Sequence, residues 1–224
     1  MEALEAGLPP HLAWRAEGLK GRILERLGRH GEAALAYERG AELALGLERY
    51  WLLLDAAAMW LEAGEGERAL LALKEAEAAV GEEDPEDAAT RHYLLARAHL
   101  LLGNPGLALE EIRKALALEE ESGHKAYGTP LVEGQALLQL GRYEEAMAAL
   151  RQAEQLASVV HADDVLATVC GNQANVMMLE HRYEQALALA ERSVSLHEAH
   201  GSGHGLAVAL ATLGQICVRL GDLA

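Results

Sequence analysis

Residues Gly141 to Ala146 read GRYEEA, and six copies of this pattern occur along the chain. Each copy starts with a residue that follows an apolar stretch, continues with small or polar residues, and reaches an alanine. The leading residues are Gly28, Gly64, Gly103, Gly141, His181 and Gly221, so successive copies lie 36, 39, 38, 40 and 40 residues apart. Each interval is about the length of two helices and two turns, which predicts a helical repeat.

The residues around each leading position predict a helix, a tight turn and a second helix. An apolar pattern with helical spacing comes before the turn, as at Leu131 and Leu138. A leading glycine supplies the left-handed backbone conformation that ends a helix. Acidic residues such as Glu144 and Glu145 then suit the first turn of the next helix, because the helix dipole attracts them. Other helix starts are predicted from potential capping residues, namely Asp84, Thr129 and Asp163 or Asp164.

Composition agrees with a helical chain and argues against several classes of partner. Hydrophobic residues make up 51% of the 224 residues and Phe is absent, so we expect a core built mainly from Ala and Leu, both strong helix formers. The formal net charge of −16 repels phosphate groups, which argues against nucleic acid and anionic membranes as partners. The longest segment without a charged residue, 201–218, has an apolar part too short to span a bilayer.

The cysteines and the first residues indicate a compartment. Cys170 and Cys217 lie in apolar helical stretches without CxxC spacing, which predicts buried thiols in a reducing environment. The start of the chain, residues 1–5, is acidic and has no apolar signal core. We therefore predict a cytoplasmic protein, and the richness in Ala, Leu and Arg is compatible with a bacterium.

Two further sets of positions keep their register from copy to copy. A small residue stands seven places before each leading residue, and a mostly large apolar residue stands four places after each turn alanine. The first set is Gly21, Ala57, Ala96, Gly134, Ala174 and Gly214, and the second is Tyr37, Leu73, Ile112, Leu150 and Ala190. This arrangement resembles the tetratricopeptide repeat, in which small residues mark where helices touch. The units are long and mostly lack the closing proline, as in kinesin light chains and large bacterial transcription activators.

The resemblance implies an all-α fold in which antiparallel helix pairs stack into a right-handed superhelix, or α-solenoid. We expect a single array over residues 1–224, with units at 11–46, 47–85, 86–125, 126–162 and 163–203 and a half unit at 204–224. The half unit contains only a first helix, whose apolar face would be partly bare. Either the chain is a piece of a longer protein or this helix meets a neighbour. The alternative fold is a non-repeating helical bundle, and the shared register of six copies argues against it.

In this family the first helix of each pair lines a concave groove, so the resemblance implies a binding site there. The candidate peptide-binding residues are Arg22, Arg26, Tyr93, Arg97, Gln135, Gln139, Asn172, Asn175, Gln215 and Arg219. The same positions add residues such as Arg15, Trp51, Leu54, Asp55 and Leu61. Trp51 fits either the core or the groove.

The polar groups of this set suggest what the groove would bind. Asn can hold a peptide backbone because its amide both donates and accepts, and Arg can bind a carboxylate through two hydrogen bonds. The inner positions hold five Arg against Glu25, Asp55 and Glu62, so we expect an acidic segment or a free C-terminus as the partner. The alternative interpretation is structural: first helices carry few Glu because they are buried, and Asn172 bonds to a neighbouring turn.

Motifs for catalysis or cofactor binding are absent from the sequence. It contains no GxxxxGK[ST], GxGxxG, GxSxG or HExxH, so we predict neither an enzyme nor a cofactor. His197, His200 and His204 have the spacing of metal ligands on a helix, but residues 201–203 interrupt them, and we predict no metal site.

The predicted function is that of a scaffold for protein–protein interaction, with the chain forming the repeat part of a larger bacterial regulator. The alternative is a structural module that forms a homodimer through its exposed C-terminal helix, about residues 206–218.

Overall fold

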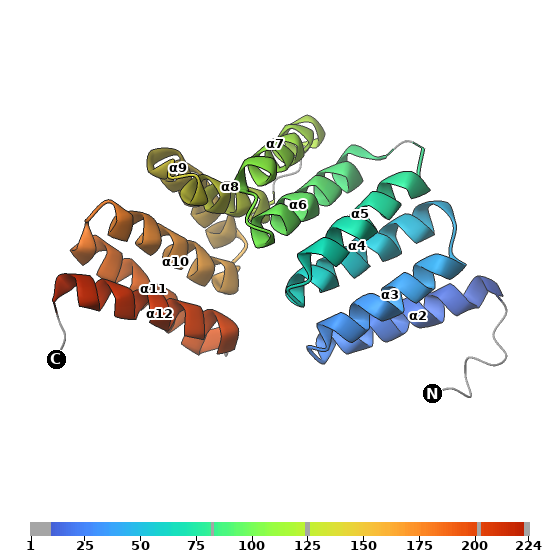
Figure 1. The fold of residues 1–224 in the computed structure, drawn as a ribbon, viewed down its shortest axis with the longest axis horizontal. Helices are drawn as coiled ribbons and strands as arrows, with labels where there is room; N and C mark the ends of the chain where they lie inside the picture. Colours follow the sequence, from blue (N-terminus) through green and yellow to red (C-terminus); the bar gives the residue numbers. More distant parts are fainter. Residues whose placement is uncertain (1–9, 82, 124–125, 201–202, 222–224) are drawn as a thin grey trace. The chain divides into compact units, whose positions relative to one another are not determined.

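The computed structural model describes residues 10–81, 83–123, 126–200 and 203–221, and within these ranges the chain forms helices and no strand (Figure 1). The helices are α2 (Pro10–Arg26), α3 (His30–Leu43), α4 (Gly46–Glu62), α5 (Gly66–Ala79), α6 (Pro85–Leu101), α7 (Pro105–Ser122), α8 (Gly128–Gln139), α9 (Tyr143–Val159), α10 (Asp163–Leu179), α11 (Tyr183–His200) and α12 (Gly203–Leu220). The predicted all-α class is confirmed.

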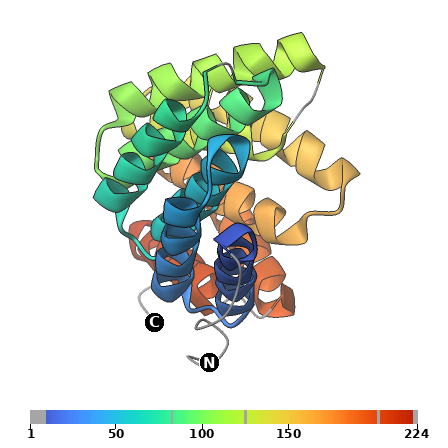
Figure 2. The ribbon, with the colours of Figure 1, turned by 90° about the vertical axis from the view of Figure 1, so that its right-hand side faces the viewer.

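The helices belong to two compact units, residues 1–122 with α2 to α7 and residues 123–224 with α8 to α12. Within each unit every helix packs against the next one along the chain. In addition, α4 contacts α6 in the first unit, and α10 contacts both α8 and α12 in the second. Pairs such as α2–α3 and α10–α11 lie side by side and antiparallel (Figures 1 and 2). Each pair corresponds to one predicted repeat, whereas a single array over the whole chain stays a prediction.

The turn within each repeat forms as the leading residues predict. Gly28 and Gly141 have φ angles of 69° and 73°. The residue after each of them donates its backbone N–H to the carbonyl five residues earlier, at 2.9 Å in both turns. This is the Schellman arrangement that satisfies the last carbonyls of a helix. His181 adopts the same conformation with φ 61°, although its Cβ makes that conformation cost about 1–2 kcal/mol.

The capping predictions are only partly confirmed. The Asp84 carboxylate accepts a hydrogen bond from the backbone N–H of Glu86 at 3.0 Å and caps α6. Helix α8 begins earlier than predicted, at Gly128 rather than after Thr129, so Pro130 lies in its first turn. A proline is tolerated there because the N–H that it lacks would have no helical partner. The residue before α10 is Ala162, so Asp163 lies inside the first turn and does not cap it.

In the core, small residues on first helices receive large residues from second helices. A Cβ added at Gly134 would lie 2.7 Å from Leu150 Cγ, and one added at Gly21 would lie 2.7 Å from the Tyr37 ring. Leu150 and Tyr37 are both buried, which confirms the predicted points of helix contact. At Gly214 no described atom lies within 4 Å of that position. The equivalent face of α12 is therefore not covered by a second helix in the described part of the chain.

Candidate binding faces on the first helices

The first helices of the pairs are α2, α4 and α6 in the first unit and α8, α10 and α12 in the second. We call the surface that they turn away from the second helices the first-helix face of each unit. All ten candidate residues lie on first helices. In the first unit Arg22 and Arg26 are exposed, and Tyr93 and Arg97 are partly exposed. Their side chains are therefore accessible to a partner.

Arg97 is held by neighbours on its own face. Its guanidinium donates a hydrogen bond to the Glu62 carboxylate at 2.7 Å and lies 5.8 Å from the centroid of the Tyr93 ring. The bond to Glu62 links α6 to α4 across adjacent repeats, whereas the contact with Tyr93 lies within α6. Because a carboxylate of the chain already neutralises Arg97, this residue is less suited to capture a carboxylate of a partner than the sequence alone indicated.

The assignment of Leu54 and Leu61 to the first-helix face is wrong. Both side chains are buried, because α4 contacts α3, α5 and α6 and little of its circumference is left open. Trp51, which fitted either the core or the groove, is 49% exposed. Its indole Nε1–H donates to the Asp87 carboxylate on α6 at 3.2 Å. Trp51 therefore belongs to the accessible face, while Trp60 lies in the core.

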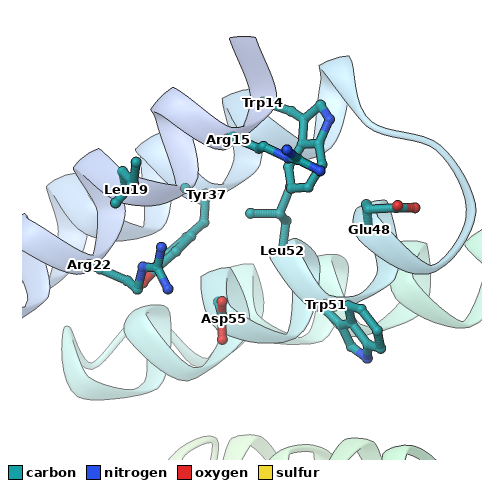
Figure 3. A pocket seen from close by; sticks show the side chains of 10 residues that line it. Trp14, Arg15, Leu19, Arg22, Tyr37, Glu48, Trp51, Leu52 and Asp55 are labelled. Atoms are coloured by element: carbon teal, nitrogen blue, oxygen red, sulfur yellow. The ribbon is translucent and has the colours of Figure 1, made fainter. Parts of the chain in front are cut away.

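A pocket of about 520 Å³ opens on the first unit where α2 and α4 both pack against α3. Its lining residues are Trp14, Arg15, Gly18, Leu19, Arg22, Tyr37, Glu48, Trp51, Leu52 and Asp55. Figure 3 shows Arg15 and Arg22 on the α2 side, and Trp51 and Asp55 on the α4 side. Leu52 and Tyr37 are buried and form the floor. A volume of this size is within the range of ligand-binding sites in proteins.

Polar and charged groups of three helices interact at one end of this pocket. The Tyr37 hydroxyl donates to the Glu25 carboxylate at 3.1 Å. Asp55 stays more than a third exposed, but the protein atoms around it displace water and raise the pKa of its carboxyl to about 6. Repulsion from Glu25 also raises this pKa, while attraction to Arg22 lowers it. Asp55 thus titrates closer to neutral pH than an ordinary aspartate does.

Of the ten candidate peptide-binding residues only Arg22 lines this pocket, while Arg15, Trp51 and Asp55 come from the further positions that the resemblance added. Sequence reasoning missed Trp14 as a residue of the site. Trp14 lies just outside the positions that the resemblance carried over. The composition held a signal that could have pointed to the site: aromatic residues form only 4% of the chain, yet Trp14, Tyr37 and Trp51 meet here.

In the second unit the six other candidate residues occupy α8, α10 and α12. Gln135, Asn172 and Asn175 are partly exposed, and the remaining members, Gln139, Gln215 and Arg219, are exposed. Asn172 donates its side-chain N–H to the Thr168 carbonyl one turn earlier at 3.0 Å. That bond matches the structural interpretation of Asn172 and leaves its amide oxygen as the group that can meet a partner.

The histidines and cysteines of the described residues form no cluster with metal-ligand geometry. No group of three or more His, Cys, Asp or Glu side chains could hold a metal ion among the residues that the structure describes. His197 is buried, its Nδ1 has no hydrogen-bond partner there, and burial lowers its pKa. Cys170 is buried as predicted, whereas Cys217 is only partly buried because α12 is poorly covered.

Helix α12 exposes apolar side chains, as the half unit predicted. Val208, Leu210 and Val218 are each about half exposed, and 17% of the helix is buried. By length and composition alone its 18 residues would be able to cross a membrane, contrary to the prediction that the apolar part of residues 201–218 is too short for this. One side of α12 nevertheless packs against α10 and α11, and Ala209 and Ile216 are buried.

Comparisons with known proteins agree with this repeat structure. Two sequence profiles of the tetratricopeptide repeat match, one at residues 165–224 and one at residues 89–122 and 132–159, and together they cover more than half of the chain. No curated protein matches the sequence.

Solved structures match over most of the chain. One is TTC0263, a thermophilic TPR protein of Thermus thermophilus, at 21% identity over 90% of this chain and 99% of that one, with a TM-score of 0.68. Another is aspartyl phosphate phosphatase F from Bacillus subtilis, at 19% identity over 86% and 51% of the chains, with a TM-score of 0.64. A third is YrrB, a TPR protein with an unusual peptide-binding site, at 17% identity over 87% and 89%, with a TM-score of 0.53. At these identities the likeness concerns the fold alone.

Proposed function

The chain belongs to the tetratricopeptide repeat family, and we propose that it is a scaffold that binds a peptide or protein segment on its first-helix faces. The observation that carries this proposal is a set of accessible polar groups with unused bonding capacity. Among the described residues, no hydrogen bond or ion pair holds Arg22, Arg26 or Asn175. Polar side chains placed on rigid helices without a structural partner are suited to contact a ligand.

The charge of these faces favours a partner segment with carboxylates. The chain as a whole has a formal charge of −16, which repels an acidic segment from most of its surface. Arg22 and Arg26 present guanidinium groups that can bind a carboxylate through two hydrogen bonds. An acidic side chain or a free C-terminus would therefore be attracted to this part of the first unit, while Asn175 can bond to peptide backbone.

Selection from a phage-displayed library of random peptides tests the proposal. Immobilised wild-type chain is expected to enrich peptides, and the enrichment should fall roughly tenfold or more for Arg26→Ala/Arg97→Ala or for Asn172→Ala/Asn175→Ala. Arg151→Ala, an exposed arginine on the second helix α9, is the matched control. Circular dichroism establishes that each variant is folded. Enrichment that survives both double variants would reject the first-helix faces as the binding surface.

A second candidate function is self-association through α12, which the exposed Val208, Leu210 and Val218 favour. Burying such side chains against a second copy would remove apolar surface from water. Sedimentation velocity should then show a dimer that Val208→Glu/Leu210→Glu dissociates while peptide enrichment persists. A wild-type chain that stays monomeric at all accessible concentrations would rule this function out.

Several features stay predictions. The protein is predicted to be bacterial and cytoplasmic and to form part of a larger regulator. It is also predicted to have no nucleic acid or membrane partner and no enzymatic activity.

A further inference from the structure

The pocket between α2 and α4 has two basic groups on one side that form no ion pair with any carboxylate of the described residues. Arg15 lies 5.0 Å from the centroid of the Trp14 ring, and neither Arg15 nor Arg22 belongs to an ion pair among the described residues. Arginines elsewhere in the described chain mostly do pair, as Arg39 does with Glu17 at 3.1 Å. Uncompensated guanidinium groups in so acidic a chain indicate a site for an external anion.

The opposite side of the pocket carries two carboxylates that also have no ion-pair partner among the described residues. Glu48 and Asp55 lie on α4, and neither forms an ion pair within the part of the chain that the structure describes. Arg22 acts on Asp55 only through the electric field across the pocket, without an ion pair between them. The two helices thus present opposite charges that face the same cavity without forming an ion pair across it (Figure 3).

The space between the charged sides is apolar and aromatic. Leu52 and Tyr37 close the floor, and the rings of Trp14 and Trp51 form part of the lining. Tryptophan and arginine are the residues that most often dominate binding energy at protein interfaces. A volume of about 520 Å³ is larger than one side chain and leaves room for the neighbouring peptide backbone.

We infer that this pocket binds an apolar side chain of a partner peptide whose flanking residues carry a carboxylate toward α2 and a cation toward α4. This inference rests on the proposed function and specifies the ligand of the first unit. The apolar side chain occupies the space above Leu52, between the tryptophans. The flanking carboxylate is bound by Arg15 or Arg22, and the flanking ammonium or guanidinium group by Glu48 or Asp55.

The protonation of Asp55 should make peptide binding depend on pH. Arg22 and Glu25 face Asp55 from α2, and Tyr37 faces it from α3. With a pKa of about 6, Asp55 loses its charge as the pH falls below this value, and the attraction for the flanking cation is lost with it. Binding of the dipolar peptide should therefore weaken between about pH 7 and pH 5, and Asp55→Asn should remove that dependence.

The same random peptide library tests the inference with variants of the pocket. Peptides enriched on the wild type should contain an apolar residue between an acidic and a basic one. Their enrichment should fall roughly tenfold or more on Trp51→Ala and on Arg15→Ala/Arg22→Ala. The matched controls are Leu71→Ala, an exposed apolar residue on α5, and Arg151→Ala.

Three outcomes separate this inference from the proposed function. The inference is supported if peptides with the motif are no longer enriched on either pocket variant while both controls enrich them as the wild type does. Enriched peptides that lack the motif, or that bind the pocket variants as well as the wild type, overturn it while the scaffold function stands. If the folded wild type enriches no peptide above an empty surface, both proposals are overturned. Because Arg15 and Arg22 are exposed, their replacement keeps the test valid even if Trp51→Ala fails to fold.

Discussion

Replacing Gly134 and Gly214 by alanine should change stability in opposite directions, although both occupy the same position of the repeat. Alanine favours a helix over glycine by about 1 kcal/mol. At Gly134 the new Cβ would lie 2.7 Å from Leu150 Cγ and 3.3 Å from the Ala146 carbonyl oxygen. Ordinary contacts begin near 3.4 Å, so the atoms must separate by about 0.7 Å, and Leu150 is buried and has little room to move.

Overpacking of this kind costs about 1–3 kcal/mol, which outweighs the gain in helix propensity. We expect Gly134→Ala to lower the free energy of unfolding by about 1 kcal/mol. At Gly214 no described atom lies within 4 Å of the added Cβ, so Gly214→Ala should raise the stability of α12 by up to about 1 kcal/mol. In a Leu150→Ala background, the cost of Gly134→Ala should disappear, because the residue that it meets is gone.

Urea denaturation followed by circular dichroism measures the effect at Gly134, and hydrogen exchange of the α12 amides measures the local effect at Gly214. The reasoning is refuted if Gly134→Ala stabilises the chain as much as Gly214→Ala does. It is also refuted if the cost at Gly134 persists unchanged in the Leu150→Ala background.

Other residues give three further predictions. Arg91 is buried and forms two hydrogen bonds with Glu83 at 2.6 and 2.8 Å, so Arg91→Ala should cost about 3 kcal/mol in urea denaturation. Arg29→Ala, which removes a solvent-exposed ion pair with Glu32, should cost much less. The folded-state pKa of Asp55 is raised to about 6. Its contribution to the stability of the fold is therefore complete below about pH 4 and is lost as the pH rises through 6. Asp55→Asn should raise the melting temperature at pH 7 and flatten the dependence of the melting temperature on pH. Burial lowers the pKa of His197, so stability should fall as the pH drops below about 6.5, and His197→Gln should reduce that loss.

Each of these predictions has a result that would contradict it. Equal effects of Arg91→Ala and Arg29→Ala would mean that burial does not strengthen the first pair. A melting temperature of Asp55→Asn that follows the wild type at every pH would show that the carboxyl is not perturbed. The same result for His197→Gln would show that this imidazole accepts a proton in the folded unit without cost.

Features within one helix pair were predictable from the sequence because they depend on local geometry. A helix repeats every 3.6 residues, so the position of Gly134 relative to Gly141 decides which side of α8 it occupies. The turn at Gly141 then brings Leu150 back onto that side. The same reasoning placed the ten candidate residues on first helices, since it requires only the register of each copy.

Features that join neighbouring repeats were not predictable, because side chains from different pairs meet at distances set by helix packing. Glu62 and Arg97 are 35 residues apart in the sequence, and no local sequence pattern predicts that they form an ion pair. Leu54 was assigned to the accessible face because the resemblance places its position of the repeat on the groove side of a first helix. The helices packed around α4 bury it, and only their arrangement determines this.

The sequence by itself determined that this protein is an all-helical repeat chain, where its turns lie, and which small residues receive which large ones. Each of these follows from periodicity and backbone conformation along a short stretch of chain. Only the tertiary structure decided that Trp14, Trp51 and Leu52 surround a pocket, and that Arg22 faces Asp55 there without an ion pair to any described residue. The physical reason is that a pocket is the space left between packed helices, and its shape and charge depend on the spacing and orientation of side chains that are distant in the sequence.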